Sequence, residues 1–132
     1  MDEDIARQIF KMKTFKSIFF AWDNINDESI IREKIALLKS VGFTNNMCRA
    51  KVQFYVYVDN GSEEEYNSGL YRCRELKKLN CNAFLMYNID NERPQRIKDL
   101  QRWANRKSLF WQFDIGDYKQ AIDTSVVSIA KY

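Results

Sequence analysis

Histidine is absent from this chain of 132 residues, and glycine, proline and cysteine number only 4, 1 and 3. The lack of histidine excludes Ser-His-Asp and Cys-His catalysis, histidine-based zinc sites and an imidazole general base. An all-β sandwich with many tight turns would need more glycine and proline, so a helix-rich α/β chain is favoured. Cys48, Cys73 and Cys81 form no C-x-x-C motif, which indicates a reducing, cytoplasmic location rather than a disulfide framework.

Long apolar runs and a strong charge of one sign are also missing. No stretch approaches the roughly 18 apolar residues of a membrane-spanning helix, and the start is acidic, so we expect no signal peptide and no membrane partner. The net charge of +3 does not by itself call for nucleic acid. With 45% hydrophobic and 30% charged residues, the chain is typical of a globular protein.

Three short apolar runs, each ending at Asp or Asn, are present at nearly even spacing. They predict strands at about 16–22, 51–58 and 82–87, and the segments between and after them have helical periodicity. This alternation is typical of consecutive β-α units with a parallel sheet. The first run is almost unbroken, which predicts a strand covered on both faces. The second alternates, which predicts that its four apolar residues share one face: Val52, Phe54, Val56 and Val58.

The fold class is therefore α/β, with three to four consecutive parallel β-α units. That number does not close a barrel, so two architectures stay open: a partial TIM-like barrel and a flavodoxin-like open sheet. Residues 1–132 form a single domain or fragment, with a core at about 3–118 and a C-terminal tail at 119–132. The segment Leu109–Phe113 is expected to be a further strand or an apolar strap across the base of the sheet.

Polar residues follow each predicted strand. Asp23, Asn24, Asp59 and Asn88 would meet at one edge, because the carboxyl ends of parallel strands lie together and bind ligands in such folds. Asp and Asn are also common turn and helix-cap residues, and this remains the competing interpretation. Likewise, Tyr57 and Tyr87 are either ligand contacts or core tyrosines with satisfied hydroxyl groups.

The order of these segments resembles the C-terminal half of radical S-adenosylmethionine (SAM) enzymes, in particular short members found in bacteria and phages. The resemblance spans roughly residues 3 to 118. It rests on these motifs: Phe20–Asn24, Lys39-x-x-Gly42, Phe54–Val58, Glu63–Glu65, Tyr71–Leu76, Ala83–Asn88 and Leu100–Asn105.

The resemblance implies that the chain supplies the fourth to sixth units of a six-unit barrel. It implies that Asp23 and Asn24 lie near the ribose of SAM, and that Tyr57, Val58 and Asp59 run beside its adenine and methionine groups. Further contacts to the adenine are implied for Met86, Tyr87 and Asn88. Family members also hold a [4Fe–4S] cluster on three cysteines, usually spaced C-x-x-x-C-x-x-C.

The chain departs from the family at the cluster motif, which is absent, and at Asp59, where the family commonly has glycine. Without a cluster no electron reaches SAM, so the resemblance implies a part of an enzyme that is inactive alone and binds no cofactor firmly. The alternative is a self-contained α/β binding or interaction module without catalytic activity. Under the first interpretation an uncovered sheet edge favours a homodimer.

The segment Arg93–Lys107 carries six cations against Asp99. Such a stripe beside Trp103 could contact phosphates or RNA, but a charge run is more often a solvated helix face. A solvated helix face is therefore the favoured interpretation, and a nucleic-acid partner is the less favoured one.

Overall fold

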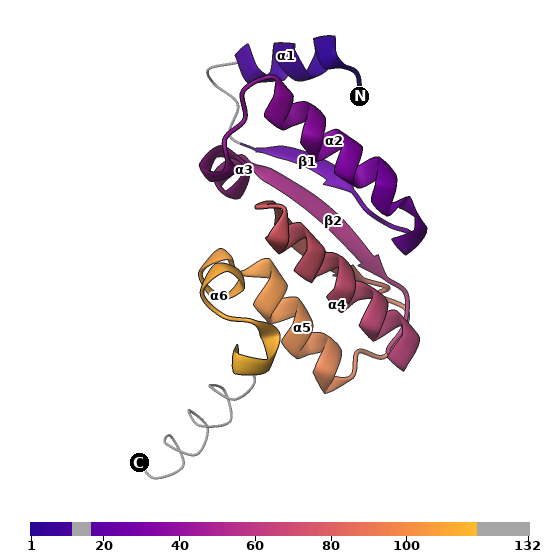
Figure 1. Ribbon diagram of the computed structural model, residues 1–132. Helices are drawn as coiled ribbons and strands as arrows, with labels where there is room; N and C mark the ends of the chain where they lie inside the picture. Colours follow the sequence, from indigo (N-terminus) through magenta and orange to yellow (C-terminus); the bar gives the residue numbers. More distant parts are fainter. Residues whose placement is uncertain (12–16, 119–132) are drawn as a thin grey trace.

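The computed structural model describes residues 1–11 and 17–118, so the predicted tail at 119–132 lies outside the described residues. Figure 1 shows helices packed along a small sheet. The elements, in chain order, are α1 (Glu3–Lys11), β1 (Ile18–Ala21), the short 3₁₀ helix η1 (Ile25–Asp27), α2 (Glu28–Ser40), α3 (Asn45–Lys51), β2 (Val52–Val58), α4 (Glu63–Lys78), β3 (Asn82–Tyr87), α5 (Gln95–Asn105) and α6 (Lys107–Gln112).

The three strands form an open parallel sheet in the order β1-β2-β3, which confirms the predicted α/β class. Phe20 lies beside Phe54 across the first pair, and Val56 lies beside Leu85 across the second. Neighbouring strands are also neighbours in the chain. The crossover from β1 to β2 contains η1, α2 and α3, and the crossover from β2 to β3 contains α4. The sheet is not closed in the described residues.

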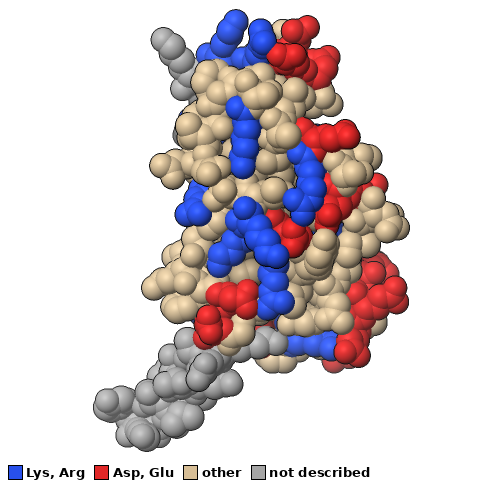
Figure 2. All heavy atoms as spheres, viewed as in Figure 1, with Lys and Arg blue, Asp and Glu red and all other residues tan. Residues whose placement is uncertain are grey.

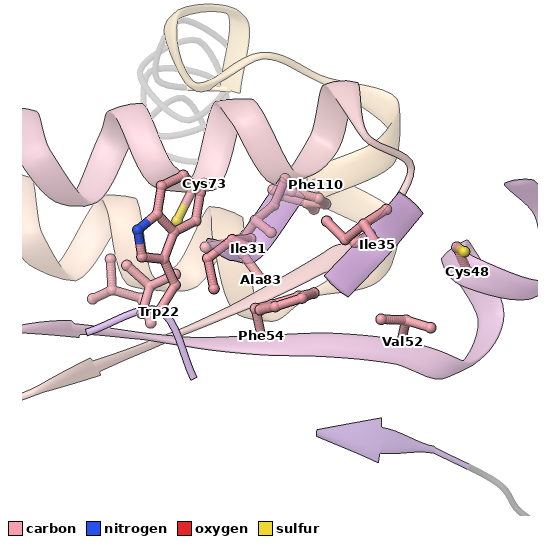
Figure 3. Close-up of a cluster of buried hydrophobic side chains, with 14 of the residues drawn as sticks. Trp22, Ile31, Ile35, Cys48, Val52, Phe54, Cys73, Ala83 and Phe110 are labelled. Atoms are coloured by element: carbon pink, nitrogen blue, oxygen red, sulfur yellow. The ribbon is translucent and has the colours of Figure 1, made fainter. Parts of the chain in front are cut away.

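The core lies between one face of this sheet and the helices α2, α4 and α5 (Figure 1). The alternation in β2 places Val52, Phe54, Val56 and Val58 on this face, all with no exposed surface, as predicted. Figure 3 shows core side chains from the sheet meeting Ile31 and Ile35 of α2 and Cys73 of α4. These positions carry the period-3.6 and period-2 apolar patterns from which the elements were predicted.

The other face of the sheet has no helix over it in the described part of the chain. Phe19 is 51% exposed and Met86 46% exposed, while Tyr55 lies between Phe19 and Phe84. The Phe19 and Tyr55 rings stack at 5.5 Å, and the Phe84 ring meets Tyr55 edge-on at 5.9 Å. The prediction that the first strand is covered on both faces is wrong here, because these aromatic residues pack against one another instead of under a helix.

The amino ends of the strands are closed by two short helices. α3, which the periodicity did not predict, begins at the N-cap Thr44, whose hydroxyl accepts from the Met47 N–H. Residues 107–112 form helix α6 rather than a strand. From it, the Trp111 indole N–H donates to the Asn82 side chain at 2.8 Å, so α6 closes the base of the sheet beside β3.

The two edges of the sheet differ. On β3, the Asn105 side chain accepts from the Leu85 N–H at 2.6 Å and donates to the Leu85 carbonyl at 3.1 Å, and Gln101 donates to the same carbonyl. On β1, the Trp22 N–H donates to the Tyr55 carbonyl, so the backbone of Trp22 faces β2. Because this direction alternates along a strand, the N–H and carbonyl of Phe19 point to the free edge. No described side chain covers that edge in the same way.

Candidate functional site

A pocket of about 850 Å³ lies where β1 and β2 end and α4 begins. Four of the residues predicted from the sequence line it together: Asp23, Asn24, Tyr57 and Asp59. The rest of its wall is Ile25 and six residues of α4: Glu64, Glu65, Asn67, Ser68, Tyr71 and Arg72. The pocket forms here because the strands are parallel, which brings their carboxyl ends to the same edge.

Asp59 is the centre of a hydrogen-bond network in this pocket. Its Oδ1 accepts from the Tyr57 hydroxyl at 3.1 Å and from Asn88 Nδ2 at 2.9 Å, while its N–H donates to Glu65 at 3.0 Å. Partial burial and the Asp59 carboxylate raise the pKa of Tyr57, so the phenol keeps its proton and remains a donor. The network fixes the orientation of the Asp59 carboxylate at the end of β2.

Asp23 and Asn24 have different surroundings. The Asn24 oxygen accepts from the Asn26 N–H at 2.9 Å and caps η1, which is the turn role considered for it. Asp23 is exposed, and its carboxylate accepts no hydrogen bond from the described residues. Its oxygens are therefore available to a ligand.

The other predicted residues lie outside the pocket. Val58 is buried in the core under α4, and Met86 lies on the uncovered face of the sheet. The Tyr87 hydroxyl donates to the Glu92 carbonyl at 2.6 Å, and Tyr87 and Asn88 line a neighbouring hollow of about 380 Å³. Asn88 alone of this group reaches the pocket network, through its bond to Asp59.

Sequence reasoning missed the contribution of α4. Its N-cap Ser62 bonds to the Glu65 N–H, and this start directs the first two turns of the helix along the pocket. Arg72 is 2% exposed although it is charged. No sequence pattern marks this burial: Arg72 shares the buried stripe of α4 with Gly69 and Leu76, but a charged residue is expected on the exposed side of a helix.

The pocket is predominantly acidic. The carboxylates Asp23, Asp59, Glu64 and Glu65 line it against one cation, Arg72. In Figure 2 many acidic side chains lie along the right-hand side of the molecule, toward which the strands point in Figure 1, and Lys and Arg run down the middle of the face in view. Such an arrangement favours ligands with cationic or hydroxyl groups.

The cysteines do not suit an iron–sulfur cluster. Cys48, Cys73 and Cys81 are all buried, and no three His, Cys, Asp or Glu side chains in residues 1–11 and 17–118 could hold a metal ion together. Burial raises the pKa of Cys73 to about 12, which opposes the thiolate that iron requires.

The basic segment 93–107 is partly engaged within the protein. Arg93 donates to Gln101, while Arg96 and Lys107 donate to backbone carbonyl groups. These contacts are typical of a structural helix face. In the part of the chain described, no helix has the length and apolarity to cross a membrane.

Comparison with known proteins gives no relative. No family model, no curated protein and no solved structure matches the chain.

Proposed function

We propose that this chain is the C-terminal part of a radical SAM enzyme, in which the strand-end pocket contributes to holding SAM and the substrate. The observation that carries the proposal is the position of the pocket at the carboxyl ends of a parallel sheet, next to a sheet face that no described helix covers. In a barrel that face is the interior, and ligands enter at the carboxyl ends of the strands.

The arrangement of helices supports a barrel segment over a flavodoxin-like sheet. A doubly wound sheet has helices on both faces, whereas α2, α4 and α5 lie on one face here (Figure 1). In a section of a barrel, the strands follow one another in chain order and the helices lie on one side of the sheet, as they do here. The exposed Phe19 and Phe84 and the half-buried Tyr55 would then pack inside the closed structure.

The two sheet edges support the same arrangement. Asn105 occupies the hydrogen-bonding groups of Leu85 on β3, which opposes the addition of another strand there. The β1 edge has no such cover among the described residues. Preceding units of a larger barrel would therefore join at β1, and β3 would be the last strand.

The polar groups of the pocket suit SAM. Asp23 has free carboxylate oxygens for a ribose diol, and the acidic surroundings attract the positively charged sulfonium and amino groups. The described residues do not provide ligands for a [4Fe–4S] cluster, because the three cysteines are buried and do not lie together with other metal ligands. The chain alone would therefore bind SAM weakly and would not cleave it.

Saturation-transfer NMR on the 132-residue chain tests the proposal, because it detects ligands with millimolar dissociation constants. SAM should give a signal, and Asp23→Asn should weaken binding about tenfold, since a hydrogen bond to a charged group contributes about 1.5–3 kcal/mol. Glu33→Gln, an exposed acid on α2 outside the pocket, is the control and should leave binding unchanged. The absence of any SAM signal at millimolar ligand, or equal loss in both variants, would contradict the proposal.

A self-contained binding module is the second candidate, because the described residues form the pocket and its Asp59 hydrogen-bond network without another chain. The two proposals differ in self-association. A barrel segment with an open β1 edge should form dimers in sedimentation velocity, whereas a module should remain monomeric at the same concentration.

A further inference from the structure

Arg72 is a buried cation in the wall of the strand-end pocket. It belongs to α4 and is 2% exposed. Its Nη1 donates to the Trp22 carbonyl at 2.7 Å, its Nη2 to the Tyr57 carbonyl at 3.0 Å, and its Nε to the Ser68 carbonyl at 3.2 Å. The guanidinium thus lies against the ends of both β1 and β2.

No carboxylate in the described residues forms a hydrogen bond or ion pair with Arg72. Glu65 and Asp23 act on its charge only from a distance, and burial lowers the pKa of Arg72 against their effect. Three of the five guanidinium N–H groups donate to the carbonyl groups, so two are left for another acceptor. Buried charges in proteins are normally paired, because the loss of hydration costs several kcal/mol. The buried Arg72 charge therefore has no anionic partner among the described residues.

We propose that Arg72 anchors the carboxylate of a small amino-acid-like ligand whose cationic groups face the acidic residues of the same pocket. A carboxylate matches the planar fork of a guanidinium. Asp23, Asp59 and Glu65 also line the pocket and disfavour a ligand that is only anionic. This proposal rests on the proposed function, which places the ligand in the strand-end pocket, and it adds that the ligand must carry a carboxylate.

A purely structural role for Arg72 makes a different prediction. As a brace between the ends of β1 and β2, Arg72 would affect every ligand of the pocket to the same degree. As an anchor, it would affect only those ligands that carry a carboxylate. The test is therefore a ratio of affinities, in which a general change in the pocket cancels.

The experiment compares SAM with decarboxylated SAM, which keeps the sulfonium and amino groups, by NMR titration of the 132-residue chain. The wild type should bind SAM about tenfold more tightly than its decarboxylated analogue. Arg72→Gln should reduce this ratio to about one. Arg74→Gln, which removes a partly exposed arginine from the same helix outside the pocket, should leave the ratio intact. An unchanged ratio in the Arg72→Gln variant would overturn the inference.

Two further measurements keep the outcome decisive. If Arg72→Gln does not fold, the Nε–Hε resonance of Arg72 in the wild type should move on addition of SAM and stay in place with the decarboxylated analogue; the same movement with both would overturn the inference. If neither form of SAM binds, the proposed function fails, and L-methionine is compared with 3-(methylthio)propylamine. A preference for L-methionine that depends on Arg72 supports the inference, and the lack of one overturns it.

Discussion

Removal of the Asn105 side chain should both destabilise the protein and open the second edge of its sheet. Asn105 accepts from the Leu85 N–H at 2.6 Å and donates to the Leu85 carbonyl at 3.1 Å. Leu85 has no exposed surface, so after Asn105→Ala its N–H would lose its acceptor. An unsatisfied buried donor costs about 1–3 kcal/mol. The carbonyl keeps the Gln101 donor, so it adds little to the cost.

Three variants separate these contributions in urea denaturation. Asn105→Ala should lower the free energy of unfolding by about 1–3 kcal/mol. Gln101→Ala should cost less, because Asn105 still satisfies both groups of Leu85. Asn46→Ala, an exposed asparagine on α3, is the matched control and should stay within about 0.5 kcal/mol of the wild type.

Self-association is the second measurement on the same variants. An uncovered edge strand is a template for pairing with another chain, so Asn105→Ala should shift sedimentation toward dimers or larger species. If Asn105→Ala keeps both the stability and the sedimentation behaviour of the wild type, water replaces the side chain and the edge argument fails.

Two other substitutions test the packing and the surface charges. In Gly69→Ala the new Cβ would lie 2.7 Å from Val58 Cγ2, so overpacking of about 1–3 kcal/mol should exceed the helix-propensity gain of about 1 kcal/mol. Urea denaturation should show a lower free energy of unfolding for Gly69→Ala, and this cost should be smaller when Val58→Ala is also present. A Gly69→Ala variant more stable than the wild type would refute this. Hydrogen bonding to Arg74 lowers the pKa of Asp114, so the stability from this pair is present above the unfolded pKa of about 3.9 and is lost as the pH falls through the lower folded value. Asp114→Asn should therefore cost at most about 1 kcal/mol at pH 7 and less at pH 3 in urea denaturation, and an equal cost at both pH values would contradict the assignment.

The fold could be predicted where the sequence has a clear period. The alternation in 52–58 gave the buried face of β2, and β3 was predicted at the residues where it lies, 82–87. Periodicity could not show that the second face of β1 stays open. Aromatic residues that pack against one another on an open face give the same apolar sequence pattern as a strand buried on both faces. Periodicity also missed α3, whose seven residues make too few turns for a pattern.

The candidate site followed from topology more than from residue types. Asp23, Tyr57 and Asp59 come together because parallel strands end at one edge, which the β-α order already implied. Val58 lies in the core, where the alternation of its strand had placed its side chain. Arg72 could not be found in this way, because its role depends on the tertiary position of α4 against two strand ends.

The agreement between strand order and chain order has a consequence for synthesis on the ribosome. β1 can pair with β2 as soon as residues 52–58 have emerged, because no later strand lies between them. α4 contacts both β2 and β3, so it completes its packing only when residues 82–87 follow. Asn105 follows at the end of α5 and closes the β3 edge that has just formed. The chain can thus fold in the direction of its translation, with the β3 edge exposed only for the time needed to make α5.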